Sequence, residues 1–326
     1  MRDDVLVVEI SGKRAGTKQQ RPTEKLPITY PHLIISNNSE GYVSEWDIVN
    51  VPDDYREWYM QNVKQSESAW YAPMNRSYAI KYAREHGYRY LIQMDDNIQS
   101  LELAIRRRRN GIQSTFSVQN NEMADEFITA LILALENSNA AQAGMVLMSV
   151  QPETIRIAER YCYSFFALDL ERCPDVFQGD FEDDIEYRLK GRQMGVGSIA
   201  LCPLRYNKTS QGNNKDLSGC RKAYAEAGVK RGENMRTLYG DVYACGTTSK
   251  RQSTMGETVE GVTYFKHKLH PFQVGVTVNE EPILEYIAEL ARKYARTQKT
   301  RYYIRKHKVK NGKNGKAAKG DKSAGV

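Results

Sequence analysis

Two acids and an amide follow directly on a run of β-forming residues. The run covers residues 88–94, and its composition predicts a buried strand. Asp95, Asp96 and Asn97 come immediately after it. In open α/β sheets, ligands bind at the carboxyl ends of the strands. Carboxylate and amide oxygens suit a divalent cation, which can in turn hold a diphosphate. The alternative is an ordinary turn, because Asp and Asn side chains satisfy turn backbone well.

A second acidic group lies near the middle of the chain. Five of the seven residues from 180 to 186 are Asp or Glu, at the start of a predicted helix. The dipole and the free N–H groups of a helix N-terminus favour negative charge, so capping accounts for some of these acids. Their density exceeds what a cap needs. A carboxylate close to other carboxylates and to an anionic substrate has a raised pKa, which suits a general base.

Alternating apolar strands and amphipathic helices are expected to position both acidic groups. The predicted strands are residues 5–10, 32–35, 48–51, 88–94, 143–150, 163–168 and 196–202, the last one closed by Pro203. The predicted helices are residues 52–68, 75–86, 122–137, 184–194 and 281–294. Gly87 and Gly195 are expected to end two of them. This alternation up to residue 204 predicts an α/β fold with a mostly parallel sheet covered on both faces.

The positive charge of the chain is concentrated at its carboxyl terminus. Residues 296–326 contain eleven Lys or Arg and one acid, a balance of +10, so the remaining residues carry −3 of the total of +7. Residues 311–326 are rich in Gly, Lys and Ala and are predicted to be disordered. Such a tail adds salt-sensitive affinity for a polyanion, unless it serves only solubility. The basic run at residues 106–109 is either a solvated face or a phosphate contact.

Cysteine usage and hydropathy restrict the class of protein. The five cysteines are scattered and form no Cys-x-x-Cys pair, which argues against a zinc ribbon and a disulfide scaffold. The longest apolar stretches are far shorter than the ~20 residues that span a bilayer. The amino terminus has no signal-peptide character. We therefore expect a cytoplasmic protein without a membrane partner.

The order of these features resembles the GT-A fold glycosyltransferases. The pattern is a strand, a helix with Asn-Arg-x-x-Ala-Ile at residues 75–80, a strand ending in Asp-Asp-Asn, a helix and a strand. A helix with Asp-Asp-Ile-Glu-Tyr-Arg at residues 183–188 and an apolar strand complete it. The resemblance implies a Rossmann-type core that binds a nucleotide-sugar over residues 1–204. It further implies an acceptor-side region over 205–300 within the same domain, followed by the basic disordered tail at 301–326.

The same resemblance implies a metal-dependent transfer from a nucleotide-sugar, with Mn²⁺ or Mg²⁺ as cofactor and a UDP-linked donor. The implied metal ligands are Asp95, Asp96, Asn97, His267 and His270. The family motif carries an acid where this chain has Asn97, and an amide brings no charge to the metal.

The resemblance also implies roles for other residues. In the family, the later acidic helix supplies the base that activates the acceptor hydroxyl. Asp184 is the expected base here, with Asp183 in reserve. The expected contacts to the nucleotide-sugar are Arg14, Asn37, Asn38, Arg76 and Asp95.

A narrower likeness is to the TET/JBP-associated glycosyltransferases, which modify hydroxymethylated bases in DNA, often in phages. It rests on the Ser-Gly-Lys-Arg-Ala loop at residues 11–15, on the basic tail and on the lack of a membrane anchor. It implies double-stranded DNA as a partner, a hydroxymethylated base as acceptor, and the host cytoplasm as location if a phage encodes the protein. The expected DNA contacts are Arg106, Arg107, Arg301, Arg305 and Lys306.

Three other functions fit parts of the sequence. The loop at residues 12–18 resembles the phosphate loop of sugar-nucleotide pyrophosphorylases, which release pyrophosphate from a nucleoside triphosphate. A glycosyltransferase acting on a polysaccharide or a protein shares every feature up to residue 204. A non-catalytic nucleic-acid-binding protein explains the basic segments but leaves both acidic groups without a role.

Overall fold

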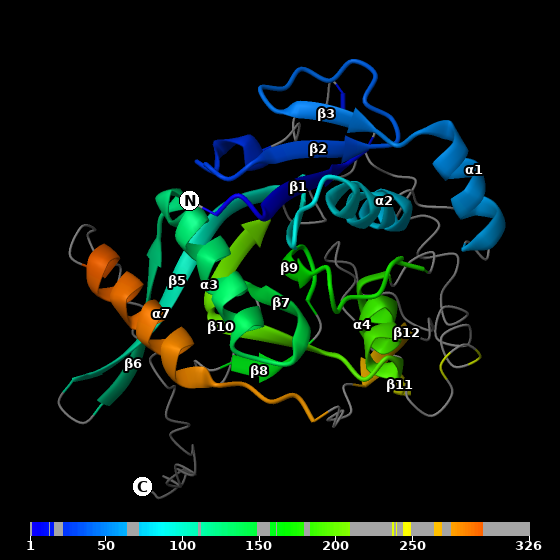
Figure 1. Ribbon diagram of the computed structural model, residues 1–326. Coiled ribbons are helices and arrows are strands. Elements are labelled where there is room, and N and C mark those ends of the chain that lie inside the picture. Colours follow the sequence, from blue (N-terminus) through cyan, green and yellow to red (C-terminus); the bar gives the residue numbers. More distant parts are fainter. Residues whose placement is uncertain are drawn as a thin grey trace, which may run out of the picture.

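Ten strands form one mixed sheet that runs through the molecule (Figure 1). The computed structural model describes residues 2–12, 14–15, 22–63, 72–109, 112–148, 157–160, 162–178, 183–208, 237, 239, 244–248, 264–268 and 275–295. In sheet order the strands are β3 (Asp47–Asn50), β2 (His32–Ser36), β1 (Val5–Ser11), β4 (Tyr90–Asp95), β9 (Phe165–Asp169), β7 (Ala140–Leu147), β10 (Gly197–Lys208), β5 (Ile98–Arg109) and β6 (Ile112–Gln119), with β8 (Ile157–Glu159) paired to β10.

Most strands of this sheet point the same way. β1 to β4 are mutually parallel, and β7 is parallel to β10. β9 is antiparallel to both β4 and β7, so these two groups share one direction. Within this sheet, β5, β8 and β9 run in the opposite direction. β6 is antiparallel to β5 and therefore runs with the majority. The predicted α/β fold with a mostly parallel sheet is therefore confirmed. The antiparallel direction of β9 is a feature that the sequence pattern did not indicate.

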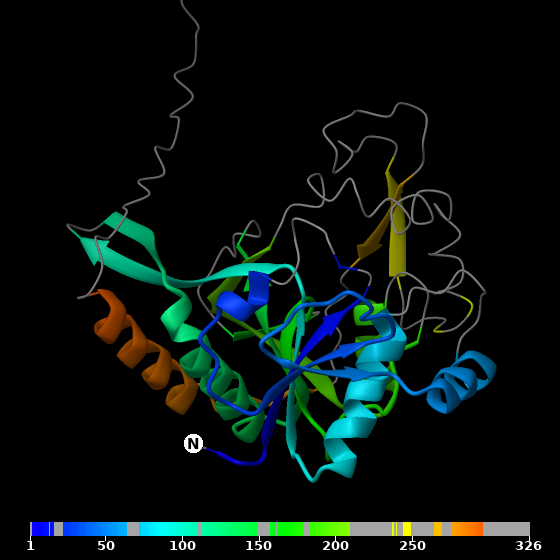
Figure 2. The same ribbon diagram turned by 90° about the horizontal axis from the view of Figure 1, so that it is seen from above.

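Helices cover both faces of the sheet, as Figure 2 shows from above. The helices are α1 (Asp53–Asn62), α2 (Ala72–Glu85), α3 (Ala124–Glu136), α4 (Asp183–Gln193) and α7 (Glu280–Ala295), with short 3-10 turns η1 (Pro22–Lys25) and η2 (Asn121–Met123). Successive side chains of a strand point to opposite faces. Val5 and Val7 therefore pack in the core with α3 and α7, whereas Leu6 and Val8 pack with α1 and α2. Because both faces are covered, every residue of β1 is buried.

The last described helix, α7, belongs to the same hydrophobic core as the first strands. The predicted apolar stripe of Ile283, Ile287, Leu290 and Tyr294 is buried in the cluster that contains β1 and α3. Lys293 Nζ also lies 2.6 Å from Glu126 Oε1 of α3. Residues 280–295 are thus packed against the predicted nucleotide-sugar-binding core.

One prediction about a strand end was wrong. Pro203 does not end its strand, because β10 continues to Lys208. The strand pairs with β8 up to Leu201 and with β5 from Leu204 onward, so Pro203 lies where the antiparallel partner changes. A proline is tolerated there because a break in the pairing does not require its missing N–H.

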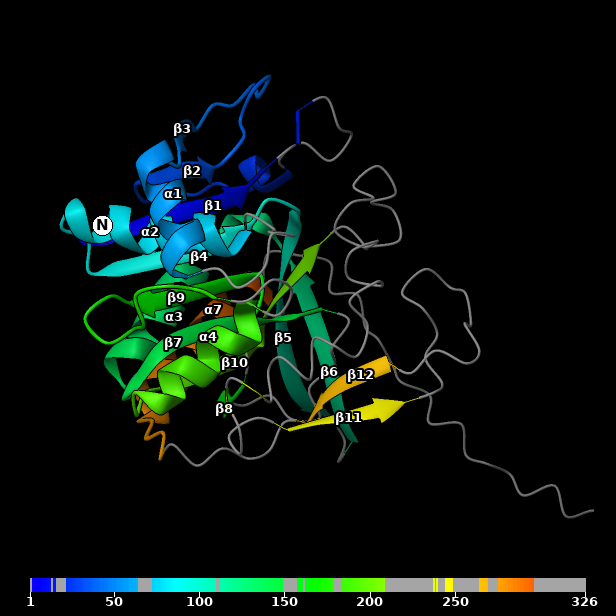
Figure 3. The ribbon, with the colours of Figure 1, turned by 90° about the vertical axis from the view of Figure 1, so that its right-hand side faces the viewer.

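The hairpin of β5 and β6 was not predicted, and residues 106–109 form its basic end rather than part of a helix or loop. A second sheet of β11 (Ala244–Thr248) and β12 (Tyr264–Lys268) is separate from the main one (Figure 3). Gly87 has a φ of 78° and follows α2, as its predicted role as a helix terminator requires. Within the described residues, no helix has the length and apolar character needed to cross a membrane.

Candidate active site

The first acidic group and the described part of the second, residues 183–186, lie at the carboxyl edge of the main sheet. Parallel strands end at the same edge, and β1, β4 and β10 end there with Ser11, Asp95 and Lys208. β9 runs the opposite way, so the residue before its start, Ser164, also lies at this edge. The sheet order therefore gathers polar side chains from distant parts of the sequence at one place.

Asp95 is held by two cations. Arg76 Nη2 lies 2.6 Å from its Oδ1, and Lys208 Nζ lies 3.3 Å from its Oδ2. The backbone N–H of Asp95 donates to the Ser164 carbonyl at 2.8 Å. Burial raises the pKa of Asp95, but the charges of Lys208 and Arg76 outweigh burial and lower the pKa to about 2. Asp95 is therefore a fixed anion at neutral pH.

Asp96 contacts a different set of side chains. Arg14 binds it through two nitrogens, with Nε 2.5 Å from Oδ2 and Nη2 2.8 Å from Oδ1. Ser11 Oγ donates to Oδ2 at 2.9 Å and also lies 2.9 Å from Tyr42 Oη. The Arg14 backbone N–H donates to the same Tyr42 hydroxyl. Asp96 thus ties the loop after β1 to the end of β4.

Arg76 joins the first acidic cluster to the second. Its guanidinium contacts Asp95 and, through Nε at 3.2 Å, Asp183 Oδ2 at the start of α4. Phe166 and Phe177 lie beneath it, with ring centroids 5.4 and 5.8 Å from Cζ. Only 6% of Arg76 is exposed. Its predicted contact with the nucleotide stays a prediction, and the observed contacts are those of a residue that positions both acids.

Asp183 and Asp184 open α4, where the helix dipole favours carboxylates. Asp183 is paired with Arg76, whereas Asp184 Oδ1 accepts a hydrogen bond of 2.8 Å from the Ile185 N–H. Both side chains are partly exposed. Burial lowers the pKa of Arg76, but the charges of Asp95, Asp183 and Asp184 outweigh burial and raise it. Both candidate bases therefore lie at the site.

Asn37 and Asn38 follow β2 at the same edge. Asn75 Nδ2 donates to Asn37 Oδ1 at 3.3 Å and to the Ser11 carbonyl at 2.9 Å. A Cβ atom on Gly12 would lie 2.9 Å from Asn37 Oδ1, so this loop position favours glycine. Asn38 is exposed, and its backbone N–H donates to Ser36 Oγ. Asn37 is thus part of the polar network around Ser11.

The turn after β4 can hold a divalent cation in part. Asn97 Oδ1 is buried and has no hydrogen-bond partner within the part of the chain that the structure describes. Asn97 follows Asp96 in the sequence, and amide and carboxylate oxygens are ligand types that Mg²⁺ and Mn²⁺ accept. Among the described residues no three His, Cys, Asp or Glu side chains come together at one point. The ligand types at this turn are compatible with a metal, but Arg14 binds both oxygens of Asp96 in the structure, so metal binding stays a prediction.

The predicted histidine ligands are placed only in part. His267 belongs to β12 of the second sheet, where it pairs with Cys245. His270 lies outside the described residues. Their role as metal ligands stays a prediction.

The predicted DNA contacts are also placed in part. Arg106 and Arg107 lie in β5, opposite Thr115 and Ser114 of β6. Arg301, Arg305 and Lys306 lie outside the described residues.

Sequence reasoning missed three residues at or near the site. Lys208 was overlooked because Pro203 was expected to end β10. Ser164, whose Oγ lies 2.6 Å from Lys208 Nζ, precedes a strand whose direction was not predicted. Glu186 is 1% exposed and was counted only as one more acid of the second group. Its position two residues after Asp184 on a helix was the available signal, because such residues lie on different faces.

Glu186 is a buried carboxyl that retains its proton to unusually high pH. Burial raises its pKa to about 7, although a hydrogen bond from Tyr239 Oη to Oε1 opposes the shift. Its Oε2 has no hydrogen-bond partner among the described residues. Because Glu186 is buried, it is a structural neighbour of the candidate bases and not a contact for an acceptor.

Glu186→Gln should remove a pH dependence of stability. The folded pKa of about 7 lies above the ordinary 4.5, so between these values the unfolded chain releases a proton that the folded protein keeps. The free energy of unfolding of the wild type should therefore fall by about 3 kcal/mol as the pH rises through this window. Urea denaturation at pH 5 and pH 7.5 measures this change. Glu85→Gln, an exposed change on α2, should keep the wild-type dependence; an unchanged dependence in Glu186→Gln contradicts the prediction.

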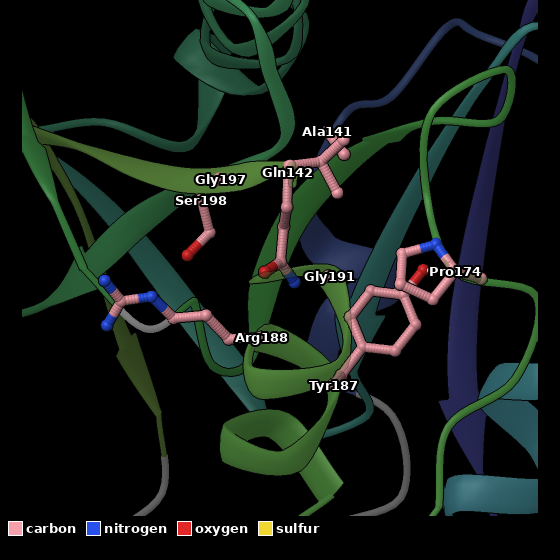
Figure 4. Close-up of a pocket in the computed structure, with 9 residues that line it drawn as sticks. Ala141, Gln142, Pro174, Tyr187, Arg188, Gly191, Gly197 and Ser198 are labelled. Carbon is pink, nitrogen blue, oxygen red and sulfur yellow. Dashed lines mark hydrogen bonds between the residues drawn. The ribbon is translucent and has the colours of Figure 1, made fainter. Parts of the chain in front are cut away.

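A small cavity lies at the opposite edge of the sheet, beneath α4 (Figure 4). Gln142 near the start of β7 and Ser198 near the start of β10 contribute to its lining, as do Tyr187 and Arg188 of α4. Both amide atoms of Gln142 lack a hydrogen-bond partner among the described residues. Because this cavity lies at the amino ends of β7 and β10, it is distinct from the site around Asp95.

Comparison with known proteins gives distant likenesses in structure alone. No family model and no curated protein matches the sequence. One similar solved structure is a "putative nucleotide-diphospho-sugar transferase" from Desulfovibrio desulfuricans G20, with 10% identity over 65% of this chain and 84% of that chain, and a TM-score of 0.37. Another is A197 from STIV, with 9% identity over 63% of this chain and 85% of that chain, and a TM-score of 0.32. At these TM-scores the likenesses add no weight to a function.

Proposed function

We propose that this protein is a glycosyltransferase that moves a sugar from a nucleotide-sugar to a hydroxyl acceptor. The observation that supports it is the meeting of two acidic groups at the carboxyl edge of the sheet, joined by Arg76 through contacts of 2.6 Å to Asp95 and 3.2 Å to Asp183. One group can serve the donor and the other the acceptor. A protein that only binds one ligand needs only one of the two acidic groups.

The donor diphosphate binds at the turn after β4. Asp96 and Asn97 would hold Mn²⁺ or Mg²⁺, whose positive charge stabilises the departing nucleoside diphosphate. Arg14 and the hydroxyl of Ser11 contact Asp96 of this turn, and Asn75 links Asn37 to the Ser11 carbonyl. These side chains offer hydrogen-bond donors and acceptors for the nucleoside part of the donor.

The acceptor is activated at the start of α4. Asp184 takes the proton from the acceptor hydroxyl as the oxygen attacks the anomeric carbon. The bond from that carbon to the diphosphate oxygen breaks, and the nucleoside diphosphate leaves. Asp183 is less suited to this task, because its carboxylate is paired with Arg76. A direct attack of this kind inverts the anomeric centre.

The finer parts of the proposal concern the acceptor. We place the acceptor side in residues 205–300 and propose a hydroxymethylated base of double-stranded DNA as the substrate. The eleven basic residues between 296 and 326 support a polyanionic partner, and four consecutive arginines end β5. A base in a duplex must be extruded or reached through a groove, at a cost of a few kcal/mol that phosphate contacts offset.

The assay for the proposal is release of UDP from a panel of UDP-sugars with Mn²⁺ and duplex DNA, hydroxymethylated or unmodified. Mass spectrometry of the digested nucleosides should show a gain of one sugar only on hydroxymethylated DNA. Slow UDP release without a DNA product would reject the DNA acceptor and keep the transferase. Absence of both binding and turnover for every nucleotide-sugar would reject the proposed function.

Asn97→Asp should tighten metal binding. The change restores a charged oxygen ligand beside Asp96 where the wild type has a neutral amide. Titration of Mn²⁺ followed by electron paramagnetic resonance should give a dissociation constant about tenfold lower than that of the wild type. Asn38→Asp, at the exposed end of β2, is the matched control and should leave the constant unchanged. Equal constants for Asn97→Asp and the wild type would remove Asn97 from the metal site.

A further inference from the structure

Lys208 is the cation at this site with no role in the transfer described above. It ends β10, and β10 reaches the carboxyl edge only because the strand continues through Pro203. Its Nζ lies 3.3 Å from Asp95 Oδ2 and 2.6 Å from Ser164 Oγ. An ammonium group has three donors. Two have partners among the described residues, which leaves one for a ligand.

The three cations at this edge differ in how much of each side chain is exposed to solvent, and this difference indicates different roles. The Arg76 side chain is 7% exposed and is surrounded by Asp95, Asp183 and two phenylalanine rings. The Lys208 side chain is 21% exposed, and its partner Asp95 is 24% exposed. The Arg14 side chain is 14% exposed, a value between those of Arg76 and Lys208. Lys208 is thus the cation that solvent, and therefore a ligand, reaches most readily.

The charges of the site require such a group. Among the described residues, the four acids Asp95, Asp96, Asp183 and Asp184 outnumber the three cations Arg14, Arg76 and Lys208 by one. A diphosphate that approaches this edge therefore meets a net negative charge. Arg14 and Lys208 are paired with consecutive carboxylates, whose Cα atoms are about 3.8 Å apart. The two cations therefore flank one turn, the one at which the donor diphosphate binds.

We propose that Lys208 is a binding residue for the diphosphate of the nucleotide-sugar, opposite Arg14 across the turn of Asp95 and Asp96. The inference rests on the proposed function and names the group that meets the phosphate charge at the end of β10. On binding, the remaining donor of Lys208 meets a phosphate oxygen, while Arg76 also keeps Asp95 paired. Ser164 Oγ anchors the ammonium group in both states.

Calorimetric titration with UDP and with UMP tests this role without any turnover. Lys208→Met should weaken UDP binding by about tenfold or more, since a hydrogen bond between charged groups is lost. Its effect on UMP should be smaller, so the ratio of UDP to UMP affinity should fall. Lys208→Arg should stay within a few-fold of the wild type, because the charge remains. Lys81→Met, which removes an exposed lysine of α2, should change neither affinity.

The outcomes separate this inference from the proposed function. If the wild type binds UDP and Lys208→Met binds it with the same affinity, the proposed role of Lys208 is overturned and the proposed transferase function stands. Failure of the wild type to bind UDP, ADP, GDP or TDP overturns the proposed function itself. Melting temperatures check that the variants are folded, and Lys208→Gln provides a second neutral variant if Lys208→Met is not.

Discussion

Asp184→Asn should lower the kcat of sugar transfer by about 10²- to 10⁴-fold, the usual contribution of a general base. The amide has the size of the carboxylate but takes no proton from the acceptor hydroxyl. It still accepts a hydrogen bond from the Ile185 N–H, which the wild-type carboxylate receives at 2.8 Å. The start of α4 should therefore stay intact. The dissociation constant for UDP, measured by calorimetry, should remain within a few-fold of the wild-type value.

The matched control is Asp183→Asn. Its carboxylate is paired with Arg76 and is not directed to an acceptor under the proposed mechanism. This variant should lose activity less severely than Asp184→Asn, by changing the position of Arg76. If Asp183→Asn is the more damaging change in a comparison of initial rates, the base is Asp183 and the assignment of the two residues is reversed.

Arg76→Met should lower the free energy of unfolding by about 3–5 kcal/mol, the range expected when one partner of a buried ion pair is removed. Asp183 then loses the cation that pairs with it in the structure, and Asp95 keeps only Lys208. Methionine has a similar length and packs well against the rings of Phe166 and Phe177. The loss of unfolding free energy therefore comes more from the broken ion pairs than from lost packing. Urea denaturation at neutral pH measures it.

Two further variants test this account of Arg76. Arg56→Met removes an arginine whose ion pair with Asp53 is exposed, and it should cost less than about 1 kcal/mol. Combining Arg76→Met with Asp183→Asn should recover part of the stability, because the second change removes the carboxylate whose ion pair with Arg76 the first change breaks. A loss for Arg76→Met as small as that for Arg56→Met would show that Arg76 does not hold the acids together.

Local sequence was enough to place most elements of this fold. The apolar stripe of α7 recurs at helical spacing, and β1 and β4 are short, continuously apolar runs, so neighbouring residues alone indicate helix or strand there. The glycine after α2 and the acids at the start of α4 are likewise local signals. For the same reason, residue type and spacing pointed to the two acidic groups, whereas the choice of Asp184 and Asp183 within the second group followed from the resemblance to the glycosyltransferases.

Strand direction and partner choice depended on the tertiary structure. β9 is antiparallel to β4 and β7, although its sequence is as apolar as that of a parallel strand. The hairpin of β5 and β6 and the passage of β10 through Pro203 depend on which strands lie beside them. A backbone hydrogen bond to a distant strand leaves no periodic mark in the sequence.

The contact between the two acidic groups could be seen only in the folded chain. Local sequence indicated that Asp95 follows one element and that Asp183 begins another. It did not determine that Arg76 lies between them, or that Lys208 reaches Asp95 from the end of a strand 113 residues away in the chain. Those contacts follow from the order of strands in the sheet, which brings the ends of β4 and β10 to one edge. Burial then makes each charge depend on its partner, because water no longer screens them.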